Sequence, residues 1–485
     1  MALTIISSDS VRMSTGTNVI YASTTTSGVF KFRFYLEIEY FVDGETTTKK
    51  IYFTQPKNSQ GKAIFNMIEI YKNMVTPMIR PSLLENEKNT STPAVITSIH
   101  KIPIDSGLSG RLYSEPFLDD ATGYGAFQGN CNKAVLSFYE MYSTTANGIP
   151  EIQGSAEVVT QWIFYGRGER NQKVSEQFTS YDLQNSTKQW LTNNYKYNSS
   201  ISRWEGYLGR SDYMTMAFFN GHVGNAASDT YSVLFQYFDK SGSQLGTALT
   251  ALNEGSSGGT YGGTDGSSNT GRSIILFIGA GLQNLDSVDT TDQAYSGDIP
   301  SVAESGGTDI DYYDMWMKSS TGAQVSRKYR FYITTPCERY EETRLAYLNK
   351  FGCWEYINLN KEKKNTYKVK RDTITKPIIS GDIPTSTQAT ALQNTYPVDV
   401  AKQGVMVTNV HIDEELSLFT QNLDDSELDR INDLIMSPQI HWLKKQDAIS
   451  LICKSNKIDT KIKGKSKLFS YELKFKFSDP KFRTI

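Results

Sequence analysis

Residues 337–360 read CERYEETRLAYLNKFGCWEYINLN, and the role of this stretch decides how the rest of the chain is interpreted. It holds two of the four cysteines and one of the six tryptophans, with arginines beside glutamates. Such residues fit a catalytic or metal site, and they equally fit a packing element. The segment RKYRFYITT at 327–335, which has strand character, leads into it.

The apolar residues of this stretch favour packing. Gly352 permits a tight backbone approach or a positive φ. We therefore predict that the segment docks an aromatic cluster. Glu341, Glu342 and Arg344 are expected to form surface ion pairs that contribute less than about 1 kcal/mol. The apolar residues recur at intervals of three: Leu345, Leu348, Phe351, Trp354 and Ile357.

The cysteines and histidines form no metal or nucleophile motif. Structural zinc needs four N or S ligands, usually in close pairs. No GxSxG elbow is present, and a cysteine nucleophile needs a neighbouring histidine that only the fold can supply. We predict no catalytic, cofactor-binding or metal-binding residues, and we interpret the cysteines as small apolar residues. The scattered residues are Cys131, Cys337, Cys353, Cys453, His100, His222, His411 and His441.

Length and composition indicate several β-rich domains. A chain of 485 residues exceeds one ordinary core, so we expect about three domains. Aromatic residues make up 12% of the sequence, and Ser, Thr, Asn and Gly are plentiful. This combination favours mainly β structure, with antiparallel β-sandwiches, thin cores and long polar loops. The net charge of −2 gives no global signal for nucleic-acid binding.

Residues 1–80 are predicted to form the strands of an N-terminal β-sandwich. VFKFRFYLEIEYFV at 29–42 alternates strictly between apolar and polar residues, which indicates a half-buried strand. Asp43 and Gly44 supply a hairpin turn, and TTTKKIYFT at 46–54 returns. We interpret GKAIFNMIEIYKNMVTPMI at 61–79 as a strand that runs into a short helix.

Residues 81–401 are predicted to form a central β-domain with long loops. The segments 133–143, 156–166 and 230–239 have strand character, and a turn is predicted at Asp239–Gly242. The Gly-rich EGSSGGTYGGTDGSSNTG at 254–271 is predicted to be a loop, as is the acidic region 286–309. Loops of this length are usually functional or ordered by a partner.

Residues 402–485 are predicted to form a small C-terminal α+β domain with a basic sheet face. VMVTNVHID at 405–413 is a predicted strand, and further strands are predicted at about 447–453, 457–463 and 467–478. From residue 444 onward, twelve Lys and Arg residues stand against four acids. The segment 424–438 is a predicted helix that Ser426 caps. Its apolar stripe is Leu428, Ile431, Leu434 and Ile435.

Two features raise the question of phosphate binding. Lys474 and Lys476 alternate with apolar residues, which is typical of a solvated sheet face, and no aromatic platform is interleaved with them. We expect non-specific proximity to DNA, or contact with an acidic protein, rather than specific recognition. FIGAGLQN at 277–284 lacks the third glycine and the helix of a dinucleotide site, so we interpret it as a turn.

Three aspartates in SGGTDIDYYDMW at 305–316 give an enzymatic alternative. The spacing of Asp309, Asp311 and Asp314 is similar to the DxDxE strand end of chitinase-like glycosidases, whose last carboxylate donates the proton. Tyr313 stands at the place of that glutamate, and the chain lacks the βα alternation of a barrel. Acids at a strand edge are usually solvated. A calcium ion held without EF-hand spacing is a further alternative.

We expect neither membrane insertion nor secretion. The longest apolar run, around IILFIGAGL at 274–282, is far shorter than the ~20 residues that a spanning helix needs. The start, MALTIISSDSVRMS, lacks the features of a signal peptide. The few, scattered cysteines do not form a disulfide framework, which fits synthesis in a reducing cytoplasm.

The order of motifs resembles a family of virion structural proteins. A strand, CERY, RLAYLNKFGCWEYINLN and the basic KKNTYKVKR follow one another. This order resembles a block in proteins of tailed phages that infect Bacteroidetes, including the crAss-like podoviruses. The hairpin and the strand–helix segment within 31–75 resemble their opening sandwich domain, and 413–443 resembles their closing domain. The middle of the chain, 81–325, matches only in general style.

The resemblance implies a non-enzymatic component of the phage tail or neck, located in the virion and assembled in the host cytoplasm. It places the chain in the stack of ring proteins beneath the portal, or at the periphery of that stack. We expect a homo-oligomeric ring of six or twelve copies, which needs two different complementary patches on each subunit. The ring is expected to contact neighbouring tail proteins and to help form the conduit for DNA ejection.

Two other functions stay open. One is a receptor- or glycan-binding module of a tail tip or fibre, with sugars stacked on the aromatic residues of 181–204. The other is a tail enzyme that cleaves polysaccharide through Asp309, Asp311 or Asp314. The aromatic residues of the first alternative are Trp190, Tyr195, Tyr197 and Trp204.

Overall fold

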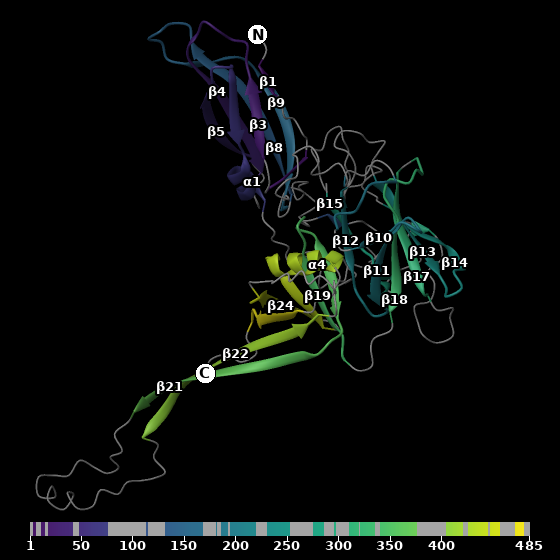
Figure 1. Ribbon diagram of the computed structural model, residues 1–485. Coiled ribbons are helices and arrows are strands. Elements are labelled where there is room, and N and C mark those ends of the chain that lie inside the picture. The colour runs from purple at the N-terminus through teal and green to yellow at the C-terminus, as the bar shows by residue number, and fades with distance from the viewer. Residues whose placement is uncertain are drawn as a thin grey trace, which may run out of the picture.

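The computed structural model of the chain is mainly β, as the sequence predicts (Figure 1). Within the described residues the strands form five sheets, and buried hydrophobic side chains gather into three cores. The structure describes residues 3–5, 11–14, 18–41, 48–75, 113–114, 131–167, 181, 186–192, 195–219, 230–252, 275–285, 295–296, 310–319, 321–334, 340–375, 404–420, 425–444, 447–455 and 471–479.

The first core lies between two sheets at the N-terminal end. The larger sheet consists of β2 (Val11–Met13), β9 (Glu151–Phe164), β8 (Cys131–Ser143), β4 (Phe30–Phe41) and β5 (Thr48–Pro56), in that order. The smaller sheet consists of β1 (Thr4–Ile5), β3 (Val19–Ser23) and β6 (Lys62–Asn66). Phe34 and Phe138 from the larger sheet pack with Ile20 and Phe65 from the smaller one. The two sheets therefore form a β-sandwich.

Several predictions for this region are confirmed. β4 buries alternate residues and pairs with β5 in an antiparallel hairpin. β6 runs into the short helix α1 (Ile68–Met74), which buries Tyr71. The predicted turn at Asp43 and Gly44 lies outside the described residues.

β8 pairs with both β4 and β9, so these central strands complete the first sheet. The predicted boundary at residue 80 therefore separates strands that share one sheet.

The second core lies between two further sheets. The larger consists of β10 (Lys196–Asn198), β11 (Arg203–Gly209), β18 (Tyr329–Thr334), β17 (Tyr312–Ser319), β13 (Thr230–Phe238), β14 (Gln244–Leu252) and β16 (Tyr295–Ser296). The smaller consists of β12 (Thr215–Phe219), β15 (Ile275–Gly279) and β7 (Tyr113–Ser114), and the short helix α2 (Leu282–Leu285) follows β15. The predicted turn at Asp239–Gly242 joins β13 to β14, and Gly242 has a φ of +78°.

The third core lies on one face of the C-terminal sheet. In order, its strands are β20 (Trp354–Leu359), β19 (Thr343–Leu348), β23 (Ile440–Lys444), β24 (Asp447–Cys453), β25 (Glu472–Phe477), β22 (Val405–Phe419) and β21 (Lys363–Thr375). The helix α4 (Asp425–Met436) buries Leu428, Ile431 and Leu434, as its predicted stripe requires. The predicted strand at 457–463 lies outside the described residues. Because β19, β20 and β21 join this sheet, the predicted boundary at 402 also divides one sheet.

The hairpin of β19 and β20 is buried on both faces. Successive residues of a strand point to opposite faces. Ala346 and Leu348 contribute to the second core, whereas Leu345 and Tyr347 contribute to the third. The stretch is therefore a packing element, as predicted. Its apolar interval of three spans two strands and a turn, so these residues do not share one face.

The turn of this hairpin contacts the first sandwich. Gly352 has a φ of +71°, as predicted, and a Cβ there would lie 2.7 Å from the ring of Tyr165. The backbone N–H of Arg167 donates to the carbonyl of Lys350 at 2.7 Å. The guanidinium of Arg167 also reaches Asp433 of α4, 3.2 Å away. The hairpin therefore touches all three cores.

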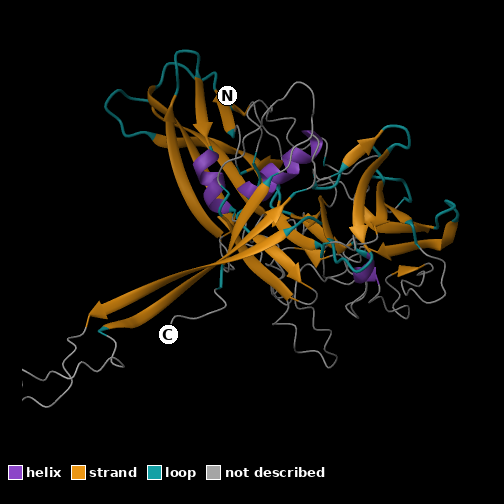
Figure 2. Ribbon diagram, turned by 60° about the horizontal axis from the view of Figure 1, so that its bottom comes forward, coloured by secondary structure: helices purple, strands orange, loops and turns teal. Residues whose placement is uncertain are grey.

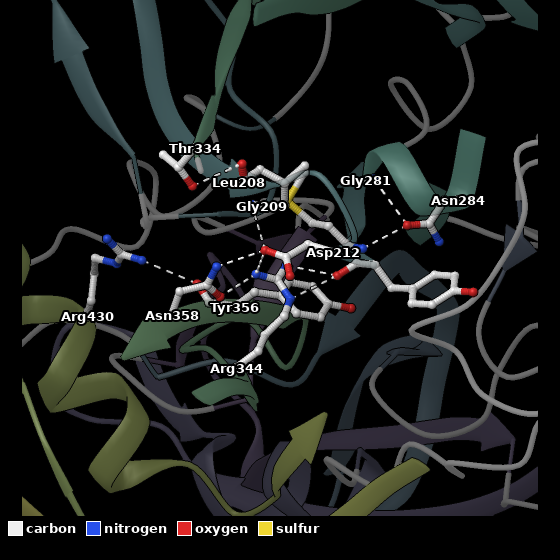
Figure 3. Close-up of polar contacts among 12 residues, drawn as sticks. Leu208, Gly209, Asp212, Gly281, Asn284, Thr334, Arg344, Tyr356, Asn358 and Arg430 are labelled. Carbon is white, nitrogen blue, oxygen red and sulfur yellow. Dashed lines mark hydrogen bonds and ion pairs between the residues drawn. The ribbon is translucent and has the colours of Figure 1, made fainter. Parts of the chain in front are cut away.

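A buried ion pair joins the hairpin to the second core (Figure 3). Arg344 of β19 and Asp212, which follows β11, are 7% and 8% exposed, and their charged atoms are 2.9 Å apart. The Asp212 carboxylate also accepts hydrogen bonds from the Gly209 N–H and the Asn358 amide, both at 2.8 Å. Arg344 donates to the Tyr213 carbonyl at 2.8 Å. The prediction of a surface ion pair is wrong for Arg344, because its strand is buried on both faces.

The neighbouring glutamates behave differently from Arg344. Glu341 is exposed and pairs with Lys363, as predicted for a surface ion pair. Glu342 is half-buried beside the Asp212–Arg344 pair. Burial and the Asp212 carboxylate raise the pKa of Glu342, whereas Arg344 lowers it. We call this contact between the hairpin and the second core the junction. It holds one arginine beside two carboxylates.

Replacing Arg344 with alanine is expected to lower the free energy of unfolding by about 3–5 kcal/mol, because Asp212 then keeps a buried charge without its partner. Urea-induced unfolding followed by tryptophan fluorescence measures the change. Glu341→Ala is the control, since it removes only an exposed pair, which contributes about 1 kcal/mol or less. Equal losses in the two variants would contradict a buried junction.

Candidate assembly surface

Two strands of the C-terminal sheet extend beyond the other described strands and helices (Figures 1 and 2). β21 and β22 pair along their whole length, from Lys363 opposite Leu418 to Thr375 opposite Val405. β25 pairs with β22 only over Glu415–Phe419. In the described part of the chain the two strands therefore continue alone, and we call residues 367–375 and 405–414 the ribbon.

The register gives the ribbon two chemically different faces. Residues that oppose each other across a strand pair share a face, and successive residues alternate between faces. What we call the apolar face carries Tyr367, Val369, Val405, Val407, Val410 and Ile412, with Arg371 and Glu414 among them. What we call the polar face carries Lys368, Lys370, Asp372, His411 and Asp413, with Ile374 and Met406 near the tip.

The apolar face continues a core surface into solvent. On the same side of β22, Leu416 and Leu418 are 0% and 1% exposed and belong to the third core. Further along, Val369 and Val407 are each 44% exposed, and Val405 is 55% exposed. Apolar side chains that stay exposed together on one face of a folded protein indicate an interaction site.

The backbone of the ribbon is also open to contact. β21 is the last strand of its sheet in the described residues, so its outer edge is free. Open edges can pair with strands of another chain, and a two-stranded ribbon alone is marginally stable in water. Thr408 forms a bulge, and its hydroxyl donates to the Asp372 carbonyl at 3.1 Å. The ribbon is therefore suited to gain stability from a protein contact.

Ion pairs orient the ribbon at the end where it leaves the sheet, which we call its root. Glu415 of β22 pairs with Lys368 of β21 at 2.7 Å and with Lys454, which follows β24. Hydrogen bonds from these two lysines hold the pKa of Glu415 at about 2. Lys476 of β25 pairs with Asp413 at 3.0 Å. The pairs connect the ribbon to its neighbouring strands and so restrain its direction.

The C-terminal sheet face is less basic than predicted, because acids lie beside its lysines. Lys474 lies 3.6 Å from Glu472, and Lys476 and Lys454 pair with acids of β22. The sequence count of basic residues began at 444 and so omitted β22. In its described part this sheet face is mixed in charge rather than uniformly basic. Proximity to DNA stays a prediction.

The aspartates of the enzymatic alternative have different surroundings. Asp314 is 2% exposed, with Arg330 at 2.7 Å and Arg203 at 3.0 Å. The expectation of a solvated edge acid is therefore wrong for Asp314, which the two arginines hold as a buried structural carboxylate. Asp311 is half-buried and lines a cavity. Asp309 lies outside the described residues.

The described cysteine and histidine side chains mostly serve packing. Cys353 is buried in the second core, and Cys453 is half-buried. His441 is 4% exposed and lies 4.8 Å from the Trp354 ring, and burial lowers the pKa of His441 to about 4. Among the described residues no three His, Cys, Asp or Glu side chains gather to hold a metal ion. The side chains outside the described residues are those of Cys131, Cys337, His100 and His222.

The aromatic residues considered for sugar stacking are mainly internal. Trp190 is 0% exposed, and its ring lies 5.4 Å from that of Phe218 in the second core. Tyr195 and Trp204 are partly buried against the same core. Of the four, Tyr197 alone is exposed, at 43%. Sugar stacking on Trp190 is therefore excluded by its burial.

The glycine turn at 277–284 packs against the junction. The predicted absence of a helix is wrong in detail, because the four-residue helix α2 follows β15. The side-chain carbonyl of Asn284 accepts hydrogen bonds from the N–H groups of Met214 at 2.8 Å and Gly281 at 3.2 Å. A Cβ at Gly281 would lie 2.4 Å from the Asp212 carbonyl oxygen. The predicted loop at 254–271 lies outside the described residues.

Sequence reasoning predicted one strand of the ribbon, β22, and missed β21 and the pairing that forms the ribbon. VMVTNVHID was predicted as a strand, and KKNTYKVKR appeared only as a basic segment of the resemblance. The available signal was the alternation of Tyr367 and Val369 with lysines. Nothing local indicated that β21 pairs with a strand that begins 30 residues after β21 ends.

Two comparisons with known proteins were negative. No protein-family model matches the chain, and no curated protein matches it. Among the helices in the described part of the chain, none combines the length and the apolar character needed to cross a bilayer.

Shortening a side chain on this face of β21 and β22 is expected to lower the free energy of unfolding strongly in the core and weakly on the ribbon. Leu416→Ala is expected to lower the free energy of unfolding by about 2–5 kcal/mol, because it opens a cavity in the third core. Val369→Ala is expected to change it by about 0.5 kcal/mol or less, because its side chain stands in solvent. Urea unfolding at a concentration where the chain is monomeric measures both. A large loss for Val369→Ala would show that something already covers the ribbon.

The Glu415 pKa tests the root of the ribbon. Lys368→Gln is expected to raise it from about 2 towards its ordinary value of 4.5. Because the folded pKa lies below the unfolded one, the stabilisation is present above pH 4.5 and is lost as the pH falls towards 2. Carboxyl-carbon NMR titration, assigned with Glu415→Gln, measures the pKa. Lys364→Gln is the control, and an equal shift there would contradict a specific contact.

Proposed function

We propose that the chain is a non-enzymatic structural component of a phage tail or neck, which assembles through its ribbon into a multi-copy ring. One observation carries this proposal: the apolar face leaves Val369, Val405 and Val407 between 44% and 55% exposed on strands that project from the body. A hairpin shared by three cores supplies a stiff body, and the ribbon supplies a long contact element. The sequence resemblance supports a place in the tail.

A second copy of the chain is the proposed occupant of the apolar face. The charges of the ribbon balance, so two copies meet without net repulsion there. A projecting ribbon that meets a different patch on the next subunit makes a head-to-tail contact, and such contacts close into rings when the rotation allows. Strand edges and faces are common recognition elements. The balancing residues are Lys368, Lys370 and Arg371 against Asp372, Asp413 and Glu414.

The proposed mechanism is geometric. Subunits arranged around the tail axis surround a channel for DNA, and their remaining surfaces contact the proteins above and below. The whole chain carries a net charge of only −2, and the described C-terminal sheet face mixes acids with lysines. Such a wall neither traps nor strongly repels a passing polyanion.

Mass photometry and negative-stain imaging of the full chain at micromolar concentration test this proposal. The parent chain is expected to form closed rings of fixed copy number. Val407→Lys is expected to yield monomers, because it places an ammonium group in the buried contact. Ile374→Lys is the matched control, since it adds the same charge near the same end of the ribbon but on the polar face, and it should still assemble.

Two results contradict the proposal. A parent chain that stays monomeric throughout the concentration range excludes self-assembly through the ribbon. A Val407→Lys variant that forms the same rings as the parent excludes the apolar face as the interface. A compact trimer would instead favour the receptor-binding module of a tail tip or fibre.

A further inference from the structure

The outer face of the larger sheet around the second core carries a row of aromatic side chains. The register places Tyr207 of β11 beside Tyr332 of β18, Tyr332 opposite Tyr312 of β17, and Tyr312 opposite Phe238 of β13. Successive rings are 5.7, 5.7 and 4.8 Å apart. The alternate residues of these strands, such as Phe331, fill the second core, so the row lies on the opposite face.

Tyr207 forms the open end of this row. It is 70% exposed. β10 pairs with β11 only over Arg203–Glu205, so within the described residues β11 is the sheet edge at Tyr207. One face of the Tyr207 ring stacks on Tyr332 with an interplanar angle of 27°. The other face is left available to a ligand.

A cavity opens beside Tyr207. Its volume is about 280 Å³, close to the lower end of the range for small-molecule sites, roughly 300 Å³. Tyrosine rings and carboxylates both contribute to the wall, which is lined by Glu205, Tyr207, Asp311, Tyr332, Ile333 and Thr334.

The two carboxylates of the cavity are held differently. Glu205 accepts hydrogen bonds from the Tyr332 hydroxyl and the Asn198 amide, both at 3.0 Å. The backbone N–H of Asp311 donates to the Phe238 carbonyl at 2.9 Å, which fixes its position. In the described part of the chain no hydrogen bond or ion pair involves the Asp311 carboxylate. Asp311 therefore offers free acceptor oxygens to a bound hydroxyl.

The charged residues next to the row pair with one another, two arginines with one carboxylate. Arg203 and Arg330 both bind Asp314, and the Arg330 guanidinium lies 4.0 Å from the centre of the Tyr312 ring. These charged groups hold one another in place and are not proposed to bind the ligand. The charged residues that line the cavity itself are the two carboxylates Glu205 and Asp311, so an anionic ligand is disfavoured there.

We propose that the cavity and the aromatic row form a binding site for a neutral saccharide chain. A sugar ring presents C–H faces that pack on aromatic rings and hydroxyls that donate to carboxylates, and this surface supplies both partners side by side. The terminal sugar of the saccharide binds between Tyr207 and Asp311, and the next sugar lies towards Tyr332. The site is separate from the ribbon and shares no residue with it.

A glycan array of neutral oligosaccharides and their uronic-acid counterparts, followed by isothermal titration of the neutral binders, tests this site on the full chain. The parent is expected to bind neutral members and to discriminate against acidic ones. Tyr207→Ala is expected to weaken binding at least tenfold, whereas Tyr207→Phe keeps the stacked ring and retains most of it. Asp311→Asn is expected to reduce the discrimination against uronic acids.

Tyr52→Ala provides the matched control. Tyr52 is 53% exposed and stacks on Tyr35 at 5.8 Å, as Tyr207 stacks on Tyr332, but it lies on the first sandwich away from the cavity. This variant should bind as the parent does. Absence of any neutral binder at millimolar concentration, a preference for acidic glycans, or equal losses for Tyr52→Ala and Tyr207→Ala would each overturn the proposal. Mass photometry of the same samples reports assembly separately.

Discussion

The ion pair between Asp212 and Arg344 fixes how the shared hairpin meets the second core of this protein. A buried ion pair adds little net stability, because desolvation offsets the attraction, yet breaking it leaves an uncompensated charge. Its main consequence here is orientation. Arg344 donates to the Asp212 carboxylate and the Tyr213 carbonyl together, so β19 meets the second core at one angle. Because β19 is buried on both faces, the same angle is imposed on the third core.

The ribbon inherits that orientation. β21 begins at Lys363, four residues beyond Leu359 at the end of β20, so the ribbon follows the hairpin closely along the chain. Lysines around Glu415 then restrain the first part of the projecting strands. An apolar surface held at a defined angle loses less conformational entropy on contact than a flexible arm does. Exposure of valines on the ribbon is thus compatible with a specific interface.

The sequence predicts elements whose signal is local, and it fails where a distant partner decides. Strand β4 and helix α4 follow from residue periodicity, because one face of each is buried. Arg344 looks like a surface residue among glutamates, since its partner lies 132 positions away. Asp314 likewise looks like a solvated acid in the sequence, because its partners Arg203 and Arg330 lie on other strands. The row that ends at Tyr207 exists only through the register of four strands, which no single segment encodes.

The two proposed contact surfaces differ in the forces that they use. The apolar face of the ribbon is mainly aliphatic, so its gain on contact comes from the area removed from water and suits another protein surface. The row beside Asp311 combines tyrosine rings with unpaired acceptor oxygens, so its gain needs a ligand with both an apolar face and hydroxyl groups. The two surfaces belong to different sheets, and the hairpin packs between the cores of those sheets. Binding at one surface is therefore expected to leave the other accessible.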